Sequence, residues 1–197
     1  KNIKLFNGKA MVHWSIIASK KSKYVDHTLV SSDSNKVIKI AKKLKADAPF
    51  KRPAFLSKDN SPIKDVIFHA VSWLRKKKKK NFDFLLLLQA TSPLRTYKHI
   101  DDSIKFYFKN MKNSKDTMVS VAKANPKTEW LVKMKKKYLR FVFNKKKILS
   151  RGMRQDIEQF FIPNGAIFFC NLNNFKGNFY TNKTLCFEMD KKFSIDI

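Results

Sequence analysis

Apolar residues recur at helical spacing along several stretches of the chain, and polar turn residues separate these stretches from short apolar runs. A repeat of about three to four residues indicates a helix with one buried face. Helices are expected at about residues 10–22, 37–44, 63–78 and 100–109. Strands are expected at about residues 28–33, 82–88, 117–121, 162–169 and 185–189. Because parallel strands need helical crossovers, this alternation predicts an α/β fold with a mostly parallel central sheet.

The pattern changes near residue 129, where short alternating runs replace the exchange of helix and strand. Strands are expected at 130–134 and 138–143, with a lysine-rich turn between them. Two such strands joined by a short polar turn form an antiparallel hairpin. We therefore expect a β-hairpin inserted at about 129–146, at the edge of the sheet.

One apolar run leads directly into a polar, proline-turned loop. Four consecutive leucines, 85–88, read as a strand that is buried on both faces. In open α/β sheets, ligands bind at the carboxyl ends of such strands. The loop places an amide, two hydroxyls and a guanidinium at that point, from Gln89, Thr91, Ser92 and Arg95.

The composition is that of a folded chain with a large excess of positive charge. Its 197 residues suit one domain, and 43% hydrophobic residues with 18 Phe are too many for a disordered chain. The formal net charge of +28 invites a nucleic-acid partner, but the lysines are spread along the chain without an aromatic-interleaved or zinc-finger motif. We expect no specific nucleic-acid partner. Whether the lysines are functional or a compositional bias stays open.

Three further features of the sequence argue against a zinc-binding, a membrane-spanning and a secreted protein. Cys170 and Cys186 lack a CxxC spacing and the histidines are scattered, which argues against a structural zinc site. No apolar segment approaches the roughly 18 residues of a membrane span. The first residues do not form a signal peptide. A cytoplasmic protein without a membrane partner is expected.

Several segments of the chain resemble, in order and at similar separations, the cytidylyltransferases that activate sialic acid and related nine-carbon acidic sugars. The most specific is LLQATSPLR at 87–95, which is similar to the family signature LLQPTSPLR. The resemblance covers nearly the whole chain. It implies a single Rossmann-like nucleotidyltransferase domain over residues 1–197, in which CTP and an acylneuraminate form a CMP-sugar and pyrophosphate. It also implies Mg2+ as cofactor and a homodimer, with the hairpin as the dimerisation element.

The first residues resemble the end of the family's amino-terminal nucleotide loop, which closes on Lys-Asn. The resemblance implies a catalytic Lys1 on the phosphates and a nucleotide-binding Asn2. Backbone N–H groups and cations in such a loop stabilise the charge that develops as pyrophosphate leaves. Most of the loop and the first parallel strand are expected to be missing from these residues.

Arg52-Pro53 followed by Asp59 resembles a family segment whose arginine lies near the nucleotide. An exposed arginine in a proline-kinked loop is the alternative. The family usually has a hydroxyl residue where this chain has Ile63, and Ser61 is the expected substitute in nucleotide binding.

Gln89 is the residue expected to act on substrate, since a carboxamide both donates and accepts and can hold a sugar hydroxyl or a base edge. The resemblance implies that it is both catalytic and sugar-binding. The family has Pro where this chain has Ala90, which loosens the loop without removing a functional group. Thr91, Ser92 and Arg95 suit ligand contact or the structure of the turn equally.

Arg154-Gln155 and the later Asn164-Gly-Ala-Ile-Phe168 resemble the family element that faces the acidic sugar. An arginine fork matches the two oxygens of a carboxylate, so Arg154 is expected to be catalytic and to bind the sugar with Gln155 and Asn164. Phe168 lacks the tyrosine hydroxyl usual in the family. Phe179-Tyr180 resembles an aromatic pair that lines the sugar pocket, and core packing is the alternative.

Asp196 resembles the first carboxylate of a family pair that holds Mg2+. Magnesium bound with a triphosphate uses one or two carboxylates with phosphate oxygens and water. The resemblance implies a second carboxylate beyond the last residue, and the chain looks cut at both ends, so residues 1–197 alone are expected to be inactive. Open alternatives are another nucleotide, another acidic sugar (legionaminic, pseudaminic or Kdo), and a non-enzymatic basic nucleic-acid-associated or interaction protein on the same scaffold.

Overall fold

The computed structural model describes residues 2–125, 131–135, 138–143 and 159–197. Its centre is a four-stranded sheet in the order β3-β7-β4-β8. These strands are β3 (Phe84–Leu88), β4 (Thr117–Lys123), β7 (Phe161–Asn171) and β8 (Thr184–Glu188). The helices are α1 (Met11–Lys21), α2 (Asn35–Lys43), α3 (Ile63–Lys78) and α4 (Tyr97–Asn110), with short 3-10 turns at Ala54–Leu56 and Lys191–Phe193. The α/β prediction is thus confirmed, and each expected helix is present.

The sheet is mixed, because one strand runs against the others. β7 pairs antiparallel with both β3 and β4, whereas β4 and β8 are parallel. β3, β4 and β8 run in the same direction, as the prediction of a mostly parallel sheet requires. β7 runs in the opposite direction, which the prediction did not include. The chain reaches β7 from β4 through the region of the expected hairpin, and a return of that kind leaves the second strand antiparallel.

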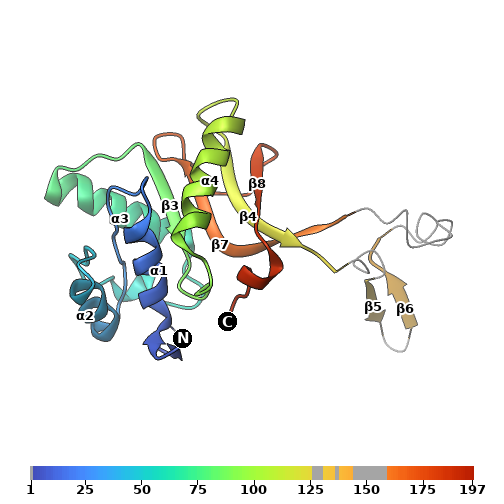
Figure 1. Ribbon diagram of the computed structural model, residues 1–197, viewed down its shortest axis with the longest axis horizontal. Coiled ribbons are helices and arrows are strands. Elements are labelled where there is room, and N and C mark those ends of the chain that lie inside the picture. Colours follow the sequence, from blue (N-terminus) through green and yellow to red (C-terminus); the bar gives the residue numbers. More distant parts are fainter. Residues whose placement is uncertain (1, 126–130, 136–137, 144–158) are drawn as a thin grey trace.

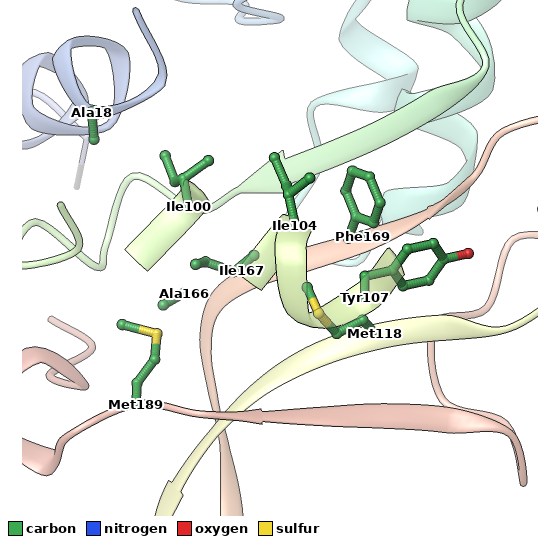
Figure 2. Close-up of a cluster of buried hydrophobic side chains, with 9 residues drawn as sticks. All are labelled: Ala18, Ile100, Ile104, Tyr107, Met118, Ala166, Ile167, Phe169 and Met189. Carbon is green, nitrogen blue, oxygen red and sulfur yellow. The ribbon is translucent and has the colours of Figure 1, made fainter. Parts of the chain in front are cut away.

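Helices cover both faces of this sheet (Figure 1). Alternate residues of β7 enter two different cores. Ile167 and Phe169 pack with residues of α1 and α4 on one face, in the cluster drawn in Figure 2. Phe168 and Cys170 pack with α3 on the other face. This alternation is the period-two pattern of a strand buried on both sides.

Two small hairpins lie outside the main sheet. β1 (Leu5–Phe6) pairs with β2 (Lys9–Ala10) just before α1. β5 (Val132–Lys135) pairs with β6 (Tyr138–Phe141), which confirms the expected strands near residue 129, and this hairpin lies beyond the ends of β4 and β7 (Figure 1).

The strand expected at 28–33 is an extended segment with isolated parallel bridges, Leu29 to Asp47 and Ser32 to Lys51. A third buried cluster joins α1 to α2 beside this segment. Within the described ranges, no helix is long and apolar enough to cross a membrane.

Candidate active site

The polar loop after β3 is held at the carboxyl end of the strand by hydrogen bonds to its backbone. The main-chain oxygen of Gln89 accepts from Ser15 Oγ at 3.1 Å and from Arg95 Nη1 at 3.2 Å. Ser15 comes from α1, so the helix and the loop are fixed to each other. The Gln89 residue itself is exposed, which leaves its carboxamide accessible to a ligand.

Arg95 is the buried centre of this arrangement, with only 2% of its surface exposed. Besides Gln89, its guanidinium donates to the main-chain oxygen of Ala166 at 2.7 Å and to Ser15 Oγ at 2.6 Å. Burial lowers the pKa of Arg95 to about 10, which still leaves it cationic at neutral pH. Of the two readings left open by the sequence, these contacts favour the structural one, because the donating nitrogens are directed at protein atoms.

Gly165 brings β7 against the side chain of Gln89. Its φ is +70°, and a Cβ built at this position would lie 2.9 Å from Gln89 Oε1. Contact of that kind is shorter than van der Waals distance, so only a glycine allows the Gln89 carboxamide to lie where it does. The Gln89 carboxamide therefore occupies space that a side chain at position 165 would fill.

Asn164 precedes this glycine and is 8% exposed. Its Oδ1 lies 2.5 Å from Ser120 Oγ and accepts from the Ala166 amide at 3.1 Å, while its Nδ2 donates to Ser194 Oγ at 2.8 Å. A carboxamide has two N–H donors, and among the described residues the bond to Ser194 uses one of them. Asn164 thus joins β4, β7 and the last residues of the chain.

The last residues lie beside the same loop. The Ile197 amide donates to the main-chain oxygen of Thr91 at 3.1 Å, which places Asp196 next to the loop as an exposed carboxylate. One exposed carboxylate fits a magnesium ion that takes its other ligands from phosphate and water. Within the described part of the chain, no group of three or more His, Cys, Asp or Glu side chains could hold a metal by itself.

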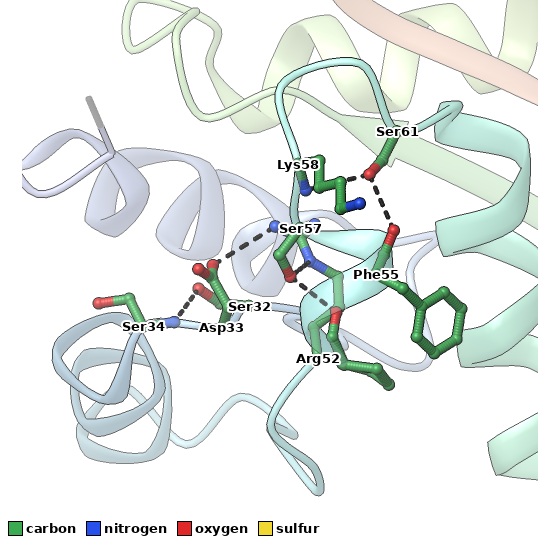
Figure 3. A network of polar contacts seen from close by, with 9 residues as sticks. Ser32, Asp33, Ser34, Arg52, Phe55, Ser57, Lys58 and Ser61 are labelled. Carbon is green, nitrogen blue, oxygen red and sulfur yellow. Dashed lines mark hydrogen bonds and ion pairs between the residues drawn. The ribbon is translucent and has the colours of Figure 1, made fainter.

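Arg52 lies at the carboxyl end of the extended segment and belongs to the polar network drawn in Figure 3. Its Nε donates to Ser57 Oγ at 3.1 Å, and its Nη2 lies 3.5 Å from Asp33 Oδ1. Ser61 accepts from the Lys58 amide and donates to the main-chain oxygen of Phe55, so it shapes the loop before α3. A cavity of about 550 Å³ opens against Asp33, Arg52 and Ser57.

The expected aromatic residues lie together on the α3 side of the sheet. Phe168 and Phe179 are 7% and 4% exposed, and their ring centroids are 5.2 Å apart. Tyr180 is 52% exposed, and its ring meets the edge of Phe168 at 6.3 Å. Phe168 and Phe179 therefore contribute to the core, and Tyr180 is accessible from solvent. Core packing was the alternative left open for the Phe179-Tyr180 pair, whereas Phe168 was expected in the sugar site.

Some of the expected site residues lie outside the described residues. These are Lys1, Arg154 and Gln155. Asn2 is described and exposed, and its main-chain oxygen accepts from the Val12 amide at 3.1 Å. The loop after β3, Asn164 and Asp196 are brought together, and Arg52 and Ser61 lie on the neighbouring segment.

Sequence reasoning missed the residues that position this site. Ser15, Ser120 and Ser194 each bond to Gln89, Asn164 or Arg95. A serine on an otherwise apolar helix face, such as Ser15, signals a buried acceptor nearby. The signal for Gly165 was available as well, because a glycine that interrupts a buried strand marks a close backbone approach.

Comparisons with known proteins identify similar proteins of one kind along nearly the whole chain. A family model described as cytidylyltransferase matches residues 1–196. N-acylneuraminate cytidylyltransferase of Escherichia coli O18:K1:H7 is 29% identical over 199 residues, covering 100% of this chain and 45% of that protein. CMP-N,N'-diacetyllegionaminic acid synthase of Legionella pneumophila is 31% identical over 132 residues, covering 66% of this chain and 54% of that protein. The chain spans about half the length of the curated relatives it matches.

A solved structure shares the fold. CMP:2-keto-3-deoxy-manno-octonic acid synthetase complexed with CTP matches with a TM-score of 0.64 and 11% sequence identity, over 96% of this chain and 83% of that chain. At this identity the similarity concerns architecture alone, and it confirms the Rossmann-like nucleotidyltransferase fold expected from the sequence.

Proposed function

The chain belongs to the cytidylyltransferase family, and from this premise we propose that it provides the nucleotidyltransferase domain of an enzyme that activates a nonulosonic acid. CTP and a sialic-acid-like sugar give a CMP-sugar and pyrophosphate. The anomeric hydroxyl oxygen of the sugar attacks the α-phosphorus of CTP, the bond from that phosphorus to the bridging oxygen of the β-phosphate breaks, and pyrophosphate leaves. The hydroxyl proton passes to solvent. The observation that carries the proposal is the meeting of Gln89, Asn164 and Asp196 beside one loop, at the carboxyl end of β3.

Each residue of this group has a role that its chemistry supports. Gln89 holds a hydroxyl of the sugar or an edge of the base, because the residue is exposed and its carboxamide, which both donates and accepts, lies against Gly165. Asn164 gives its remaining N–H to the sugar. Arg52, on the segment that neighbours the loop after β3, places a cation near the nucleotide. Catalysis then rests mainly on positioning. Reactants that are already held in line lose less translational and rotational entropy on reaching the transition state.

We propose Mg2+ as the cofactor, with Asp196 as the protein carboxylate that holds it. When bound, such an ion neutralises phosphate charge and lowers the pKa of the attacking hydroxyl. Lys1 on the phosphates, Arg154 and Gln155 on the sugar, and Tyr180 at the rim of the sugar pocket complete the proposal.

Pyrophosphate release tests this function in the full-length gene product that contains these residues. We expect turnover with CTP and an acidic sugar in the presence of Mg2+. Gln89→Ala should lower turnover by at least about tenfold, the lower range for a lost positioning contact. Asn173→Ala is the matched control, because it removes an exposed carboxamide just after β7, beside the amino end of β3. No turnover by folded protein with any nucleotide and acidic sugar would refute the proposal.

A second acidic sugar is the runner-up substrate. The similarity to a legionaminic acid synthase, at 31% identity, supports it as directly as the similarity to the sialic acid enzyme supports the first. The sugar panel therefore includes legionaminic acid, pseudaminic acid and Kdo beside sialic acid, and the ratio of kcat/KM values decides between them.

We propose that the protein is a homodimer joined through the β5–β6 hairpin and the start of β7. Large apolar side chains are exposed there: Leu131, Met134, Leu139, Val142, Phe161 and Ile162. Met134 is 83% exposed and Leu139 is 60% exposed. Large apolar side chains that are exposed together on one segment support an interface there.

Charged residues at the hairpin should therefore yield monomers. Met134→Glu combined with Leu139→Glu is expected to halve the mass measured by light scattering, because carboxylates are poorly tolerated in an apolar interface. Leu5→Glu is the control, since Leu5 is 75% exposed but lies on the β1–β2 hairpin. A double variant that keeps the mass of the unmodified dimer would contradict the proposed interface.

A further inference from the structure

The four helices end on the side of the molecule that lies away from the candidate site. Helix α3 leads into β3 and helix α4 leads into β4, and these two strands run in the same direction. Helices α1 and α2 lead in the same way into two extended segments that are joined by parallel bridges. Because these connections are short, the last turn of each helix lies near the amino end of the strand or segment that follows. The candidate site lies at the carboxyl end of β3.

Contacts between neighbouring elements hold these helix ends side by side. Lys20 Nζ, at the end of α1, donates to the main-chain oxygen of Lys45, just after α2, at 3.0 Å. The half-exposed ring of Phe108, near the end of α4, meets the ring of Phe84 at the start of β3, with centroids 5.0 Å apart. The ends of α1 and α4 lie toward the top of Figure 1, and both chain termini lie toward the bottom.

His27 joins these two pairs of contacts. Its Nε2 lies 3.4 Å from Asp47 Oδ2, and its ring stacks on Phe82 with centroids 5.2 Å apart. Burial lowers the pKa of His27, and Lys80 and Lys78 at the end of α3 lower it further, against the opposite effect of Asp47. The four helix ends therefore form one surface, made of residues 20–27, 42–47, 75–83 and 109–116. We call it the basal face.

Exposed cations crowd the basal face. Residues 75–80 are all arginine or lysine, and all of them are exposed. The last turns of the other three helices add Lys20, Lys21, Lys42, Lys43 and Lys109. Among the described residues of this face, Asp26 and Asp83 are the exposed carboxylates. Asp47 is half-buried and Asp116 is buried.

The cations of the basal face have no carboxylate partners within the described ranges, where no ion pair joins one of them to Asp or Glu. At the carboxyl ends of the strands, by contrast, Arg52, Lys123 and Lys192 each pair with a carboxylate at 3.4 or 3.5 Å. A cation in the last turn of a helix also stabilises that helix, but this effect falls off within one turn. Lys112 and Lys115 lie beyond the end of α4. Helix stabilisation therefore does not account for the whole face.

The chemistry and breadth of the face favour an anionic bilayer over a nucleic acid. Its named cations are all lysines except Arg75, and lysine is a compact point charge, whereas arginine is preferred for reading single phosphates. Helices on both faces of the sheet contribute, so the charge spreads in two dimensions, as contact with a flat surface requires. Tyr24, which is 48% exposed beside Lys23, adds a ring of the kind enriched at the headgroup level of membranes.

We propose that the basal face docks the protein on a membrane surface rich in anionic lipids, with the candidate site turned toward the solution. Lysines near such a surface are attracted to it, and the attraction falls off within a Debye length. The sequence predicts no membrane partner because it lacks a spanning segment, and contact with the surface needs none. The proposal concerns the opposite end of the sheet from the candidate site and is independent of the reaction and its substrate.

Sedimentation with lipid vesicles tests the face in the full-length gene product that contains these residues. The vesicles hold equal parts of phosphatidylcholine and phosphatidylglycerol. The test variant combines Lys21→Gln, Lys43→Gln, Lys77→Gln and Lys109→Gln, one change in the last turn of each helix. We expect its vesicle dissociation constant to rise by at least about tenfold, because four cations are lost from the contact.

The matched control removes the same charge from the carboxyl end of the sheet. It combines Lys36→Gln, Lys58→Gln, Lys98→Gln and Lys191→Gln, all at exposed positions. The two variants have the same net charge, so a difference between them reports where the charges lie. The control should bind vesicles nearly as well as the unmodified protein. Equal weakening of both variants would overturn the proposal, because the attraction would then follow total charge alone.

Two further measurements complete the test. Equally strong binding of the unmodified protein to vesicles of phosphatidylcholine alone would overturn the proposal, since no anionic headgroup is present there. A mixed-sequence RNA duplex is titrated at physiological ionic strength, where nonspecific phosphate contacts are weakened. If the test variant loses RNA binding while no protein binds vesicles, the basal face belongs to a nucleic acid and the proposal is wrong. Circular dichroism shows that all three proteins are folded.

Discussion

Replacing Arg95 with leucine is expected to lower the free energy of unfolding by about 2–4 kcal/mol, since each buried polar group left unpaired costs roughly 1–3 kcal/mol. The side chain donates to two main-chain oxygens and one hydroxyl while only 2% of it is exposed. Ala166 is fully buried, so its main-chain oxygen has no water to replace the lost donor. The Gln89 oxygen keeps its bond to Ser15.

Two effects oppose each other in this variant. Leucine removes the cost of burying a charge, and replacing buried ions by apolar residues is sometimes neutral. Here the partners of the cation are main-chain oxygens that cannot be replaced together with it, so the loss of pairing dominates. Chemical denaturation at neutral pH measures the difference.

Two control variants separate these contributions. Arg75→Leu removes the same charge from the exposed last turn of α3, and it should change stability little, because the protein already carries a net charge of +28. Arg95→Lys keeps the charge but lacks the planar fork that reaches three acceptors, so it should be intermediate. Equal stability of Arg95→Leu and Arg75→Leu would show that Arg95 does not hold the loop.

The location of the candidate site could be proposed from sequence because it depends on local pattern. A run of leucines followed by Gln89 and a proline-turned loop places polar groups at the carboxyl end of a buried strand whatever the rest of the sheet does. The helices were predictable for the same reason, because periodicity is a property of neighbouring residues. Family resemblance singled out Asn164 for the sugar and Asp196 for the metal, and the structure places both near that loop.

The pairing of the strands could not be predicted from local pattern. β7 is as apolar as a parallel central strand, yet it lies antiparallel between β3 and β4. Burial on both faces determines composition but not direction, since direction depends on the connection before the strand. The extended segment at 28–32 is a related case, because its β-branched pattern predicts a strand but its described pairing consists of isolated bridges.

The roles of single polar residues were equally hard to predict. Arg95 and Asn164 carry the same functional groups whether they contact substrate or backbone, and only their burial and partners distinguish the two. Phe168 and Phe179 illustrate the same limit for aromatic residues. A pocket wall and a core have nearly the same composition, so the sequence leaves both open.

Gly165→Ala is expected to lower turnover of the full-length gene product by about tenfold to a hundredfold, because it displaces a positioned group by a distance that is costly in catalysis. The new methyl would lie 2.9 Å from Gln89 Oε1, so the carboxamide must move. Backbone strain at a φ of +70° adds about 1 kcal/mol of lost stability. Steady-state kinetics and denaturation measure the two effects separately.

The matched control for the strain is Gly8→Ala. Gly8 has a φ of +73°, and nothing lies within 4 Å of a Cβ built there. It should therefore lose a similar amount of stability without any contact to a site residue. A larger loss in Gly165→Ala than in Gly8→Ala reports the cost of moving Gln89.

A double-mutant cycle tests whether Gly165 acts through Gln89. If it does, adding Gly165→Ala to Gln89→Ala costs little further turnover, because the displaced carboxamide is already absent, and the two effects are strongly non-additive. Full additivity of the two losses would mean that the glycine serves the site by another route, such as the hydrogen bonds of the neighbouring Asn164 and Ala166. The cycle thus decides whether the close approach of β7 to the loop exists to position one carboxamide.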